Sequence, residues 1–476
     1  MSDAPRTGRL ARGAIAGMAV ARAGAAQLGH SAQGLTRSPA QLESARAAHE
    51  AKLGRILFGA LNQLKGTALK ASQLLSLELG LLPEGMRREL AKAHYQVTPL
   101  NRALVIKLLR QEFGRGPDEL FAQFEPSAFA AASLGQVHGA TLASGEALAV
   151  KLQYPGMAAS IGSDMAMLRM LLQTLARGSQ SLPNAAITER VLVDIELKLA
   201  EELDYAHEAE QLSWFRQAYA ARPDLVVPQT FPLLSSKRVL AMQRLAGLHL
   251  NEWLASQPSQ TQRDHFGQVL FDTFMYSLFV LRRLQADPHP GNYLFMEDGR
   301  LGLLDFGCTK QFSAAFCDGI GVAWSALLCR PIDLTRVQQA YLALGLIAPS
   351  LSSAEFREQL MPALAATQAW QTAPFGAADY DFGLLPDLPR PEPALQQQAV
   401  RYLHSLAPEL PFFDRAYLGL LQMLKALGAR VSTRNPWIGP NCQNAISTSQ
   451  EREGPPRPCL TPSGGGRRRS SAWGRS

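Results

Sequence analysis

Two short segments carry side chains whose types and spacing suit phosphoryl transfer. The first, Gln285-Ala-Asp-Pro-His-Pro-Gly-Asn292, holds Asp287 and Asn292 five residues apart, and the second, Leu301-Gly-Leu-Leu-Asp-Phe-Gly307, places Asp305 thirteen residues after Asn292. Phosphoryl transfer needs oxygen ligands for Mg²⁺ and a group that orients the nucleophile. Protein kinases use an Asp, an Asn five residues later and the Asp of a DFG motif. The spacing therefore predicts Asp287 as the catalytic residue and Asn292 and Asp305 as magnesium ligands.

The chain contains a second Asp-Phe-Gly sequence at residues 381–383. No strand is predicted before it and no Asp/Asn loop lies upstream, so the other parts of a kinase site are missing there. A tripeptide alone is a weak signal. We therefore expect Asp305, and not Asp381, to bind the metal.

A phosphate-binding site also needs a cation, and Lys151 is the candidate. It ends the segment Ala147-Leu-Ala-Val-Lys151, as the strand lysine of protein kinases does, which predicts a contact with the α- and β-phosphates. The alternative is that Lys151 is a solvated lysine on a strand without a functional role. The helical region that follows offers Glu202, Asp204 and Glu208 as partners. We expect Lys151 to pair with Glu208, or failing that with Glu202.

The elements that must position these residues follow from hydrophobic periodicity and turn residues. Residues 135–152 predict a β-hairpin that turns at Ser144-Gly145. The other expected elements are helices near 38–77, 84–96, 99–113, 158–177, 185–218 and 413–427, strands near 224–228 and 238–243, and a loop over 372–398 rich in Pro, Ala and Gln.

These patterns predict an α+β protein with a protein-kinase-like two-lobed fold and a helical N-terminal extension. Its 476 residues are enough for one large two-lobed unit. The expected segments are a basic Ala/Gly-rich N-terminal segment (1–37), the helical extension (38–123), a kinase-like N-lobe (124–245), a helical C-lobe (246–432) and a disordered tail (433–476).

The positive charge of the chain lies at its ends. The first 50 residues carry six Arg against three acidic residues and the last 27 carry six Arg against two, which accounts for the whole net charge of +7. A nucleic-acid-binding domain carries its positive charge on the folded part, so no nucleic-acid partner is expected. Solvated tails are the bland interpretation of the basic ends, and contact with an anionic membrane is the functional alternative.

The cysteines and the apolar segments of the sequence give an expectation for the cellular location of the protein. The five Cys form no CxxC pair, which argues against a disulfide framework or a zinc site and favours a reducing compartment. No uncharged apolar run reaches the roughly 20 residues that span a bilayer. The apolar stretch around residues 13–21 is either an interfacial helix or a frayed Ala/Gly-rich helix, and it faintly resembles an organelle transit peptide. The expected location is cytoplasmic, at most peripheral to a membrane, or the mitochondrial matrix in a eukaryote.

Four motifs make the chain resemble a known family over about residues 45–430. They are Phe129-Ala-Ala-Ala-Ser-Leu-Gly-Gln-Val-His138, Val150-Lys-Leu-Gln-Tyr-Pro-Gly156, Glu202-Leu-Asp-Tyr205 and Asp287-Pro-His-Pro-Gly-Asn292. This set is similar to the UbiB-like (AarF) atypical kinases, which support ubiquinone biosynthesis. The resemblance implies ATP and Mg²⁺ as cofactors. It also implies isoprenoid quinone intermediates, or other proteins of ubiquinone biosynthesis, as partners.

The resemblance also implies site residues that the spacing does not reveal. An alanine-rich nucleotide loop replaces the glycine-rich loop of ordinary kinases, and Ala130, Ala131, Ala132 and Ser133 occupy it here. A Cβ restricts the approach of backbone N–H groups to phosphate, so this loop is expected to tune the choice between ATP and ADP. An Ala-rich helical turn is the bland alternative.

A KxGQ motif of the family matches Lys70-Ala-Ser-Gln73, with Ser72 in place of the family's glycine. The resemblance implies that Lys70 and Gln73 reach the active site and that Lys70 meets the acids Glu202 and Asp204. The extra side chain of Ser72 either pushes its helix outward or donates a hydrogen bond that holds it. We expect the docked arrangement.

Two departures limit the comparison with ordinary protein kinases. Gln285-Ala286 stands where those kinases have His-Arg, and no Ala-Pro-Glu signature follows Asp305. Docking of a protein substrate is therefore not supported. The leading hypothesis is an ATP- and magnesium-dependent atypical kinase or ATPase that acts on or with lipids or small molecules. The alternatives are a non-catalytic nucleotide-binding scaffold for quinone-biosynthesis enzymes and a conventional protein kinase.

Overall fold

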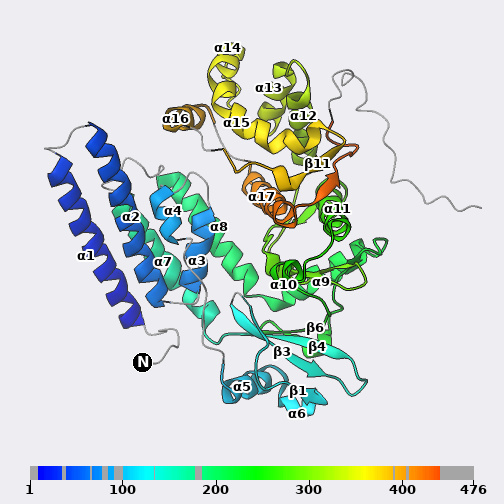
Figure 1. Ribbon diagram of the computed structural model, residues 1–476. Coiled ribbons are helices and arrows are strands. Elements are labelled where there is room, and N and C mark those ends of the chain that lie inside the picture. The colour runs from blue at the N-terminus through cyan, green and yellow to red at the C-terminus, as the bar shows by residue number, and fades with distance from the viewer. Residues whose placement is uncertain are drawn as a thin grey trace, which may run out of the picture.

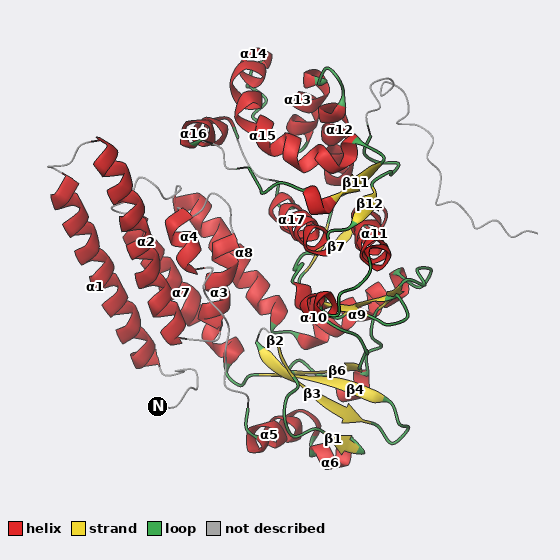
Figure 2. Cartoon of the chain, in the orientation of Figure 1, coloured by secondary structure: helices red, strands yellow, loops and turns green. Residues whose placement is uncertain are grey.

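The computed structural model describes residues 9–34, 39–64, 67–77, 84–90, 100–132, 134–176, 185–389, 392–403 and 407–439. Figure 1 shows a small lobe built on a sheet, a larger helical lobe and a group of helices beside them. This arrangement is the predicted α+β, two-lobed fold with a helical N-terminal extension. Figure 2 shows that the strands gather in the small lobe and in short ladders of the larger one.

The small lobe is a five-stranded antiparallel sheet. Its strands are β1 (Gln123–Phe124), β2 (Ala130–Ala132), β3 (Gly135–Thr141), β4 (Ala147–Gln153) and β6 (Val239–Gln243), in the order β1-β3-β4-β6 with β2 paired to β3. The predicted hairpin is the β3–β4 pair, with Val137 opposite Lys151. Six consecutive residues of β4 are buried, as expected of a central strand covered on both faces.

Helices cover the two faces of this sheet. α5 (Arg102–Phe113) buries Val105, Leu108 and Leu109 against Val150 and neighbouring strand residues, and α6 (Pro117–Leu120) adds Leu120 to the same cluster. α5 begins at the N-cap Asn101, whose side chain accepts a hydrogen bond from Leu104 N, and ends at a left-handed Gly114. α9 (Tyr205–Ala218) joins the hydrophobic core of the larger lobe.

The extension buries a hydrophobic cluster of its own, shared by six helices. They are α1 (Arg9–Gly34), α2 (Pro39–Leu64), α3 (Thr67–Leu77), α4 (Glu84–Leu90), α7 (Met157–Ala176) and α8 (Ala185–Glu202). α7 and α8 follow β4 in the chain, yet Figure 1 shows them beside α2 and α3. The packing therefore differs from the predicted boundaries, which gave residues 38–123 to the extension and 124–245 to the N-lobe. α5 packs on the sheet and α7–α8 pack on the extension, because apolar stripes on distant segments match each other.

The larger lobe is mostly helical, with short two- and three-stranded ladders. Its helices are α10 (Leu250–Ala255), α11 (Gln260–Tyr276), α12 (Ala314–Leu328), α13 (Leu334–Ala343), α14 (Ser353–Glu355), α15 (Met361–Thr372), α16 (Pro393–Tyr402) and α17 (Leu410–Leu427). Its ladders are β5 (Leu225–Val226) with β9 (Leu301–Leu303) and β8 (Tyr293–Phe295), β7 (Arg283–Gln285) with β10 (Thr309–Gln311), and β11 (Asp379–Asp381) with β12 (Arg430–Ser432).

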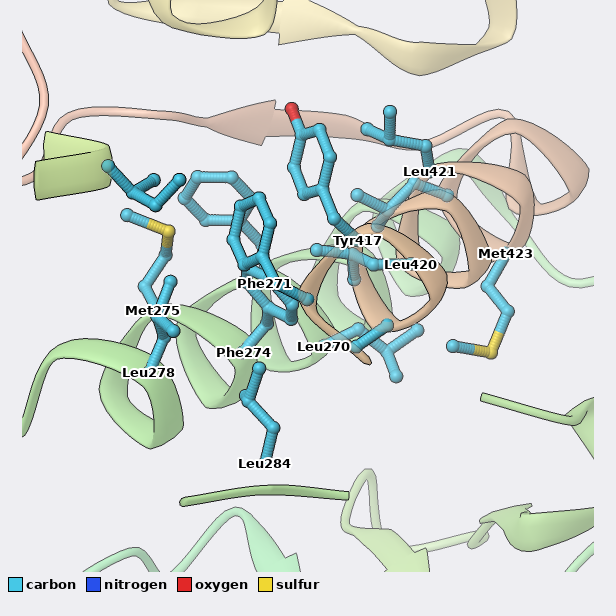
Figure 3. Packing of buried hydrophobic residues seen from close by; sticks show 14 of the residues in the cluster. Leu270, Phe271, Phe274, Met275, Leu278, Leu284, Tyr417, Leu420, Leu421 and Met423 are labelled. Atoms are coloured by element: carbon cyan, nitrogen blue, oxygen red, sulfur yellow. The ribbon is translucent and has the colours of Figure 1, made fainter. Parts of the chain in front are cut away.

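The core of this lobe lies between α11 and α17. Figure 3 shows Phe271 and Phe274 of α11 facing Tyr417 and Leu420 of α17. The Phe274 and Tyr417 rings lie 5.7 Å apart between centroids, at a tilt of 45°. This packing holds α17 against the segment that carries Asp287, since Gly419 lies directly under the Pro288 ring.

Two expectations for the C-terminal part were wrong. The predicted loop over 372–398 contains β11 and the start of α16, and β11 ends at Asp381, so a strand does precede the second Asp-Phe-Gly. Its partner β12 lies about 50 residues later, which local sequence patterns do not reveal.

The chain also remains packed past residue 432, where the disordered tail was expected to begin. Thr433 is buried and donates a hydrogen bond to Pro374 O at 2.7 Å. Trp437 stacks on Phe279 with ring centroids 5.0 Å apart, and Ile438 is buried. Aromatic and apolar side chains therefore anchor residues 433–439 in spite of the polar composition. The expectation for residues 440–476 lies outside the described residues.

The contact between α17 and the segment that carries Asp287 gives a stability prediction. A Cβ added at Gly419 would overlap the Pro288 ring, so Gly419→Ala is expected to destabilise the protein by about 1–3 kcal/mol. The matched control is Gly162→Ala in α7, where nothing lies within 4 Å of the added Cβ. This control is expected to gain up to about 1 kcal/mol, because Ala favours helix. Urea unfolding measures the stability of both variants, and equal stabilities would contradict the close contact between Gly419 and Pro288.

Candidate active site

The segment after β7 forms a tight loop organised around one carbonyl oxygen. Asp287 O accepts hydrogen bonds from the Asn292 side-chain amide at 2.9 Å, from His289 N at 2.7 Å and from the Gln285 side-chain amide. A 3₁₀ turn, η3 (Pro290–Asn292), closes the loop. The amide nitrogen of Asn292 is held by the loop itself. Its amide oxygen is therefore the atom that could bind a metal ion.

Asp305 follows β9 and lies beside Lys151. One oxygen of Asp305 accepts from Gly307 N at 2.8 Å, and the other lies 3.1 Å from Lys151 Nζ. The Lys151 ammonium also donates to both oxygens of Glu208, at 2.8 and 2.9 Å. The predicted pairing of Lys151 with Glu208 is therefore present, and Glu202 pairs elsewhere. One buried cation thus contacts two carboxylates, Glu208 on α9 and Asp305 after β9.

Burial and the neighbouring charges shift the pKa values of Lys151 and Glu208. Burial, opposed by Lys151 and assisted by the nearby Asp305 carboxylate, raises the pKa of Glu208 to about 7. Burial lowers the pKa of Lys151, but Asp305 and Glu208 outweigh it and hold the pKa well above its usual value. Lys151 therefore stays charged, and Glu208 is the group that takes up a proton.

The N-terminal extension reaches the same site through Lys70. Its ammonium lies 3.0 Å from a carboxylate oxygen of Glu202, as expected for a docked extension. Burial lowers the pKa of Lys70, but Glu202 and Asp287 raise it above its ordinary value. Asp204 has a different role, because its side chain caps α9 by accepting from Ala206 N and His207 N.

The helix that carries Lys70 is docked although Ser72 replaces glycine. Ser72 is fully buried, and its hydroxyl has no hydrogen-bond partner. The serine therefore neither pushes α3 away nor holds it by a hydrogen bond. Apolar neighbours such as Leu74 and Leu75 are buried in the shared cluster and hold the helix instead. The side chain of Gln73 lies outside the described residues.

The sequence did not single out Arg415 on α17. Its guanidinium lies 2.6 Å from a carboxylate oxygen of Asp287. Burial raises the pKa of Asp287, but Lys70 and Arg415 outweigh it and hold the pKa below its usual range. No sequence signal distinguishes Arg415 from a solvated helix arginine, because its partner lies 128 residues earlier.

A small cavity brings four of the predicted residues together. Lys70, Glu202, Asp287 and Asp305 line it with Arg415 and neighbouring side chains. A second cavity is lined by Asn292 and Asp305 among mostly apolar residues. Asp305 therefore lines both cavities.

The alanine-rich segment is an edge strand of the small lobe. Ala130, Ala131 and Ala132 form β2 and pair with Val137, Gln136 and Gly135 of β3, while Ser133 lies outside the described residues. The segment is thus a strand and not the alternative helical turn. At its end, a Cβ on Gly135 would lie 2.7 Å from the hydroxyl of Tyr205, which is buried without a hydrogen-bond partner. The lining of the cavity around Lys70 and Asp287 includes no residue of β2.

The residues present fit a magnesium–nucleotide complex. Mg²⁺ uses one or two protein ligands and completes its shell with phosphate oxygens and water. The Asn292 amide oxygen and the Asp305 side chain, which is 28% exposed, meet this need. Among the residues that the structure describes, no three His, Cys, Asp or Glu side chains are grouped as a metal site.

The fold and the site together define a kinase-like protein. Residues 92–340 match the model of the ABC1 atypical kinase-like domain. The chain belongs to this family of atypical kinases, which includes proteins named for the AarF domain and for COQ8. Where the structure describes the chain, no helix is both long enough and apolar enough to span a bilayer.

Curated relatives support the assignment. An aarF domain-containing protein kinase of Arabidopsis thaliana, a chloroplast protein, is 30% identical over 405 residues, which are 84% of this chain and 54% of that protein. The mitochondrial atypical kinase COQ8B of Rattus norvegicus is 34% identical over 257 residues, or 54% of this chain and 48% of that protein. The mitochondrial COQ8 of Saccharomyces cerevisiae is 30% identical over 54% of this chain and 50% of that protein. The chain spans about half the length of these relatives.

A solved structure supports the fold. The Mycobacterium tuberculosis protein Rv3197, solved in complex with erythromycin, aligns with a TM-score of 0.58 and 23% identity. The alignment covers 84% of this chain and 100% of that one.

The raised pKa of Glu208 predicts a pH dependence of stability. In the metal-free protein Glu208 titrates near 7, against 4.5 in an unstructured chain, so folding takes up a proton between these values. The free energy of unfolding is therefore expected to fall as pH rises from about 4.5 to 7, by on the order of 2 kcal/mol. Glu208→Gln should lack this fall, as urea unfolding at several pH values would show.

The matched control is Glu196→Gln, which breaks the half-buried pair between Glu196 and Arg169 on neighbouring helices. This variant should keep the pH dependence of the wild type. A wild-type curve parallel to that of Glu208→Gln across the window would contradict the assignment of the proton to Glu208.

Proposed function

We propose that this protein binds ATP with Mg²⁺ and transfers or hydrolyses its terminal phosphoryl group. The observation that carries the proposal is the position of Lys151, which bridges Glu208 and Asp305 next to the Asp287–Asn292 loop. Lys151 stays charged and is held from two sides, so it can neutralise the α- and β-phosphates. Asn292 and Asp305 would hold the metal ion, which supplies charge stabilisation to the transferred group.

Asp287 would orient the attacking group. Lys70 and Arg415 keep its carboxylate ionised, and Arg415 fixes one oxygen in place. A carboxylate with a lowered pKa is a weak proton acceptor, so its main contribution is a hydrogen bond to the nucleophile. The nucleophile is water or the hydroxyl of a bound acceptor.

Access to Asp287 favours a small acceptor. α3 lies over the site, because Lys70 pairs with Glu202 and both line the cavity that contains Asp287. We expect α3 to hinder the approach of an extended protein segment to this carboxylate. We therefore propose a lipid or small molecule as acceptor or activator, with isoprenoid quinone intermediates or other ubiquinone-biosynthesis proteins as partners. We place the protein in the cytoplasm, peripheral to a membrane, or in the matrix if it is mitochondrial.

Turnover of ATP separates this proposal from its alternatives. Purified protein should release phosphate from ATP in the presence of Mg²⁺, and anionic liposomes with a quinone-like phenol should increase the rate. Tight ATP binding without release of phosphate under any of these conditions would favour a nucleotide-binding scaffold. Phosphorylation of an added protein would favour a conventional protein kinase.

The two Asp-Phe-Gly sequences provide a matched pair for the metal assignment. Both aspartates accept a hydrogen bond from the following glycine N, at 2.8 Å for Asp305 and 3.0 Å for Asp381. Asp305→Asn is expected to weaken Mg²⁺-dependent nucleotide binding by on the order of 100-fold, since the triphosphate charge is then poorly neutralised. Asp381→Asn should bind as the wild type does. Calorimetric titration with and without Mg²⁺ measures both, and equal affinities for the two variants would refute the assignment.

A further inference from the structure

One face of the small-lobe sheet points into the proposed nucleotide site. Residues directly opposite each other on paired strands have side chains on the same face, and so do residues two apart along one strand. Val137 lies opposite Lys151, and Gly139 lies opposite Ala149. Lys151 reaches Asp305, and Ala149 belongs to the hydrophobic core of the larger lobe. Val137 and Gly139 of β3 therefore face the site as well.

This face continues past Lys151 in two directions. Gly139 and Gly135 each lie two residues from Val137, or about 7 Å along β3. At Gly135 a Cβ would lie 2.7 Å from the buried hydroxyl of Tyr205, so that end is closed. At Gly139 the neighbouring side chains are exposed to solvent. A nucleotide whose phosphates contact Lys151 therefore has room for its sugar and base toward Gly139.

Three side chains gather over Gly139. A Cβ on this glycine would collide with the Glu125 carboxyl and the Arg244 guanidinium, which form an ion pair at 2.7 Å. The Phe129 ring stacks on the guanidinium, with Arg244 Cζ 4.3 Å from the ring centroid. Phe129 directly precedes β2, and Arg244 directly follows β6. β2 and β6 lie on either side of the β3–β4 hairpin in the same sheet (Figure 2).

Backbone hydrogen bonds fix this group on β3. Glu125 N donates to Gly139 O at 2.8 Å, and Phe129 N donates to Val137 O at 2.9 Å. The side chains themselves are open to solvent, with exposed fractions of 49% for Glu125, 47% for Phe129 and 39% for Arg244. An aromatic plane and a guanidinium plane are thus presented in contact with each other at the edge of the site.

These two planes suit a nucleobase. Stacking of one base on an aromatic side chain is typically worth about 5- to 150-fold in affinity, and an arginine adds a cation–π contribution. Lys151 supplies charge for the phosphates but no plane for the base. Phe129 and Arg244 provide the planes, and they lie along the direction in which the base extends.

We propose that Phe129 and Arg244 hold the base of a bound nucleoside triphosphate between the aromatic ring and the guanidinium. The base enters by separating the two planes, which exposed side chains permit. Glu125 pairs with the guanidinium and thereby limits its rotation. This inference rests on the proposed function, because it requires the phosphates of the nucleotide at Lys151.

The first test compares ATP with inorganic tripolyphosphate, each with Mg²⁺, by calorimetric titration of the full chain. Phe129→Leu keeps an apolar side chain but removes the aromatic plane, and Arg244→Lys keeps the charge but removes the guanidinium plane. Each variant should bind ATP about tenfold more weakly than the wild type does. Both should bind tripolyphosphate as the wild type does, because this ligand has no base.

The matched control is Arg238→Lys at the start of β6. The Arg238 side chain is equally exposed, at 39%, and also pairs with a glutamate, Glu112 of α5. α5 packs against Val150, which alternates with Lys151 and faces away from the site. Arg238→Lys should therefore bind ATP as the wild type does. Equal weakening of ATP binding by Arg238→Lys and Arg244→Lys would overturn the proposal.

A fluorescence measurement reports the stacking itself. Phe129→Trp restores an aromatic plane and should bind ATP at least as tightly as the wild type does. ATP should quench the added fluorescence, whereas tripolyphosphate should not, and the wild type measured in parallel gives the signal of the native tryptophans. ATP binding without quenching of the added fluorescence would show that the base lies elsewhere.

The outcomes separate this inference from the proposed function. Asp305→Asn should weaken binding of both ligands, because it acts on the metal and the phosphates. If Asp305→Asn weakens ATP binding while Phe129→Leu and Arg244→Lys leave it unchanged, the proposed function stands and the base stacking is wrong. Equal weakening of ATP and tripolyphosphate by Phe129→Leu would also contradict base stacking. A wild type that binds neither ligand would refute the proposed function and the base stacking with it.

Discussion

The ion pairs of Lys151 hold the two lobes in register. The lysine comes from β4 of the small lobe, Glu208 from α9 and Asp305 from the end of β9 in the larger lobe, and all contacts are 3.1 Å or shorter. Removal of one partner from a buried ion pair typically costs about 3–5 kcal/mol, because it leaves an uncompensated charge. The same three residues are those proposed to hold phosphate and metal. The relative position of the lobes and the arrangement of the proposed phosphate and metal ligands therefore depend on the same three charged residues.

A second pair of contacts brings the N-terminal extension into the site. Lys70 reaches Glu202 at the end of α8, and Arg415 of α17 reaches Asp287. These four charges come from four segments far apart in the sequence, and they line one cavity. The cations hold Asp287 ionised, while the helix that supplies Lys70 limits what can approach it. The extension is therefore part of the proposed catalytic unit.

The pattern of local elements followed from the sequence, and their packing did not. The β3–β4 hairpin and α17 were predicted because the alternation of strands and the stripe of helices are local patterns. The sequence did not predict that α7 and α8 share a hydrophobic core with the extension, because an apolar stripe on one helix does not indicate which other helix it packs against. The β11–β12 ladder was missed for the same reason. The sequence already ranked Glu208 above Glu202 as the partner of Lys151, and the structure contains this pair.

The sequence by itself determined the kinase-like class, because Asp287, Asn292 and Asp305 stand at spacings that phosphoryl transfer requires. It also indicated Lys151, which ends a recognisable strand. Only the tertiary structure decided that Arg415 holds Asp287, that Asp204 caps a helix and that Ser72 is buried without a hydrogen-bond partner. The physical reason is one of range. Spacing and periodicity report contacts within an element, whereas an ion pair between segments more than 100 residues apart depends on how whole elements pack.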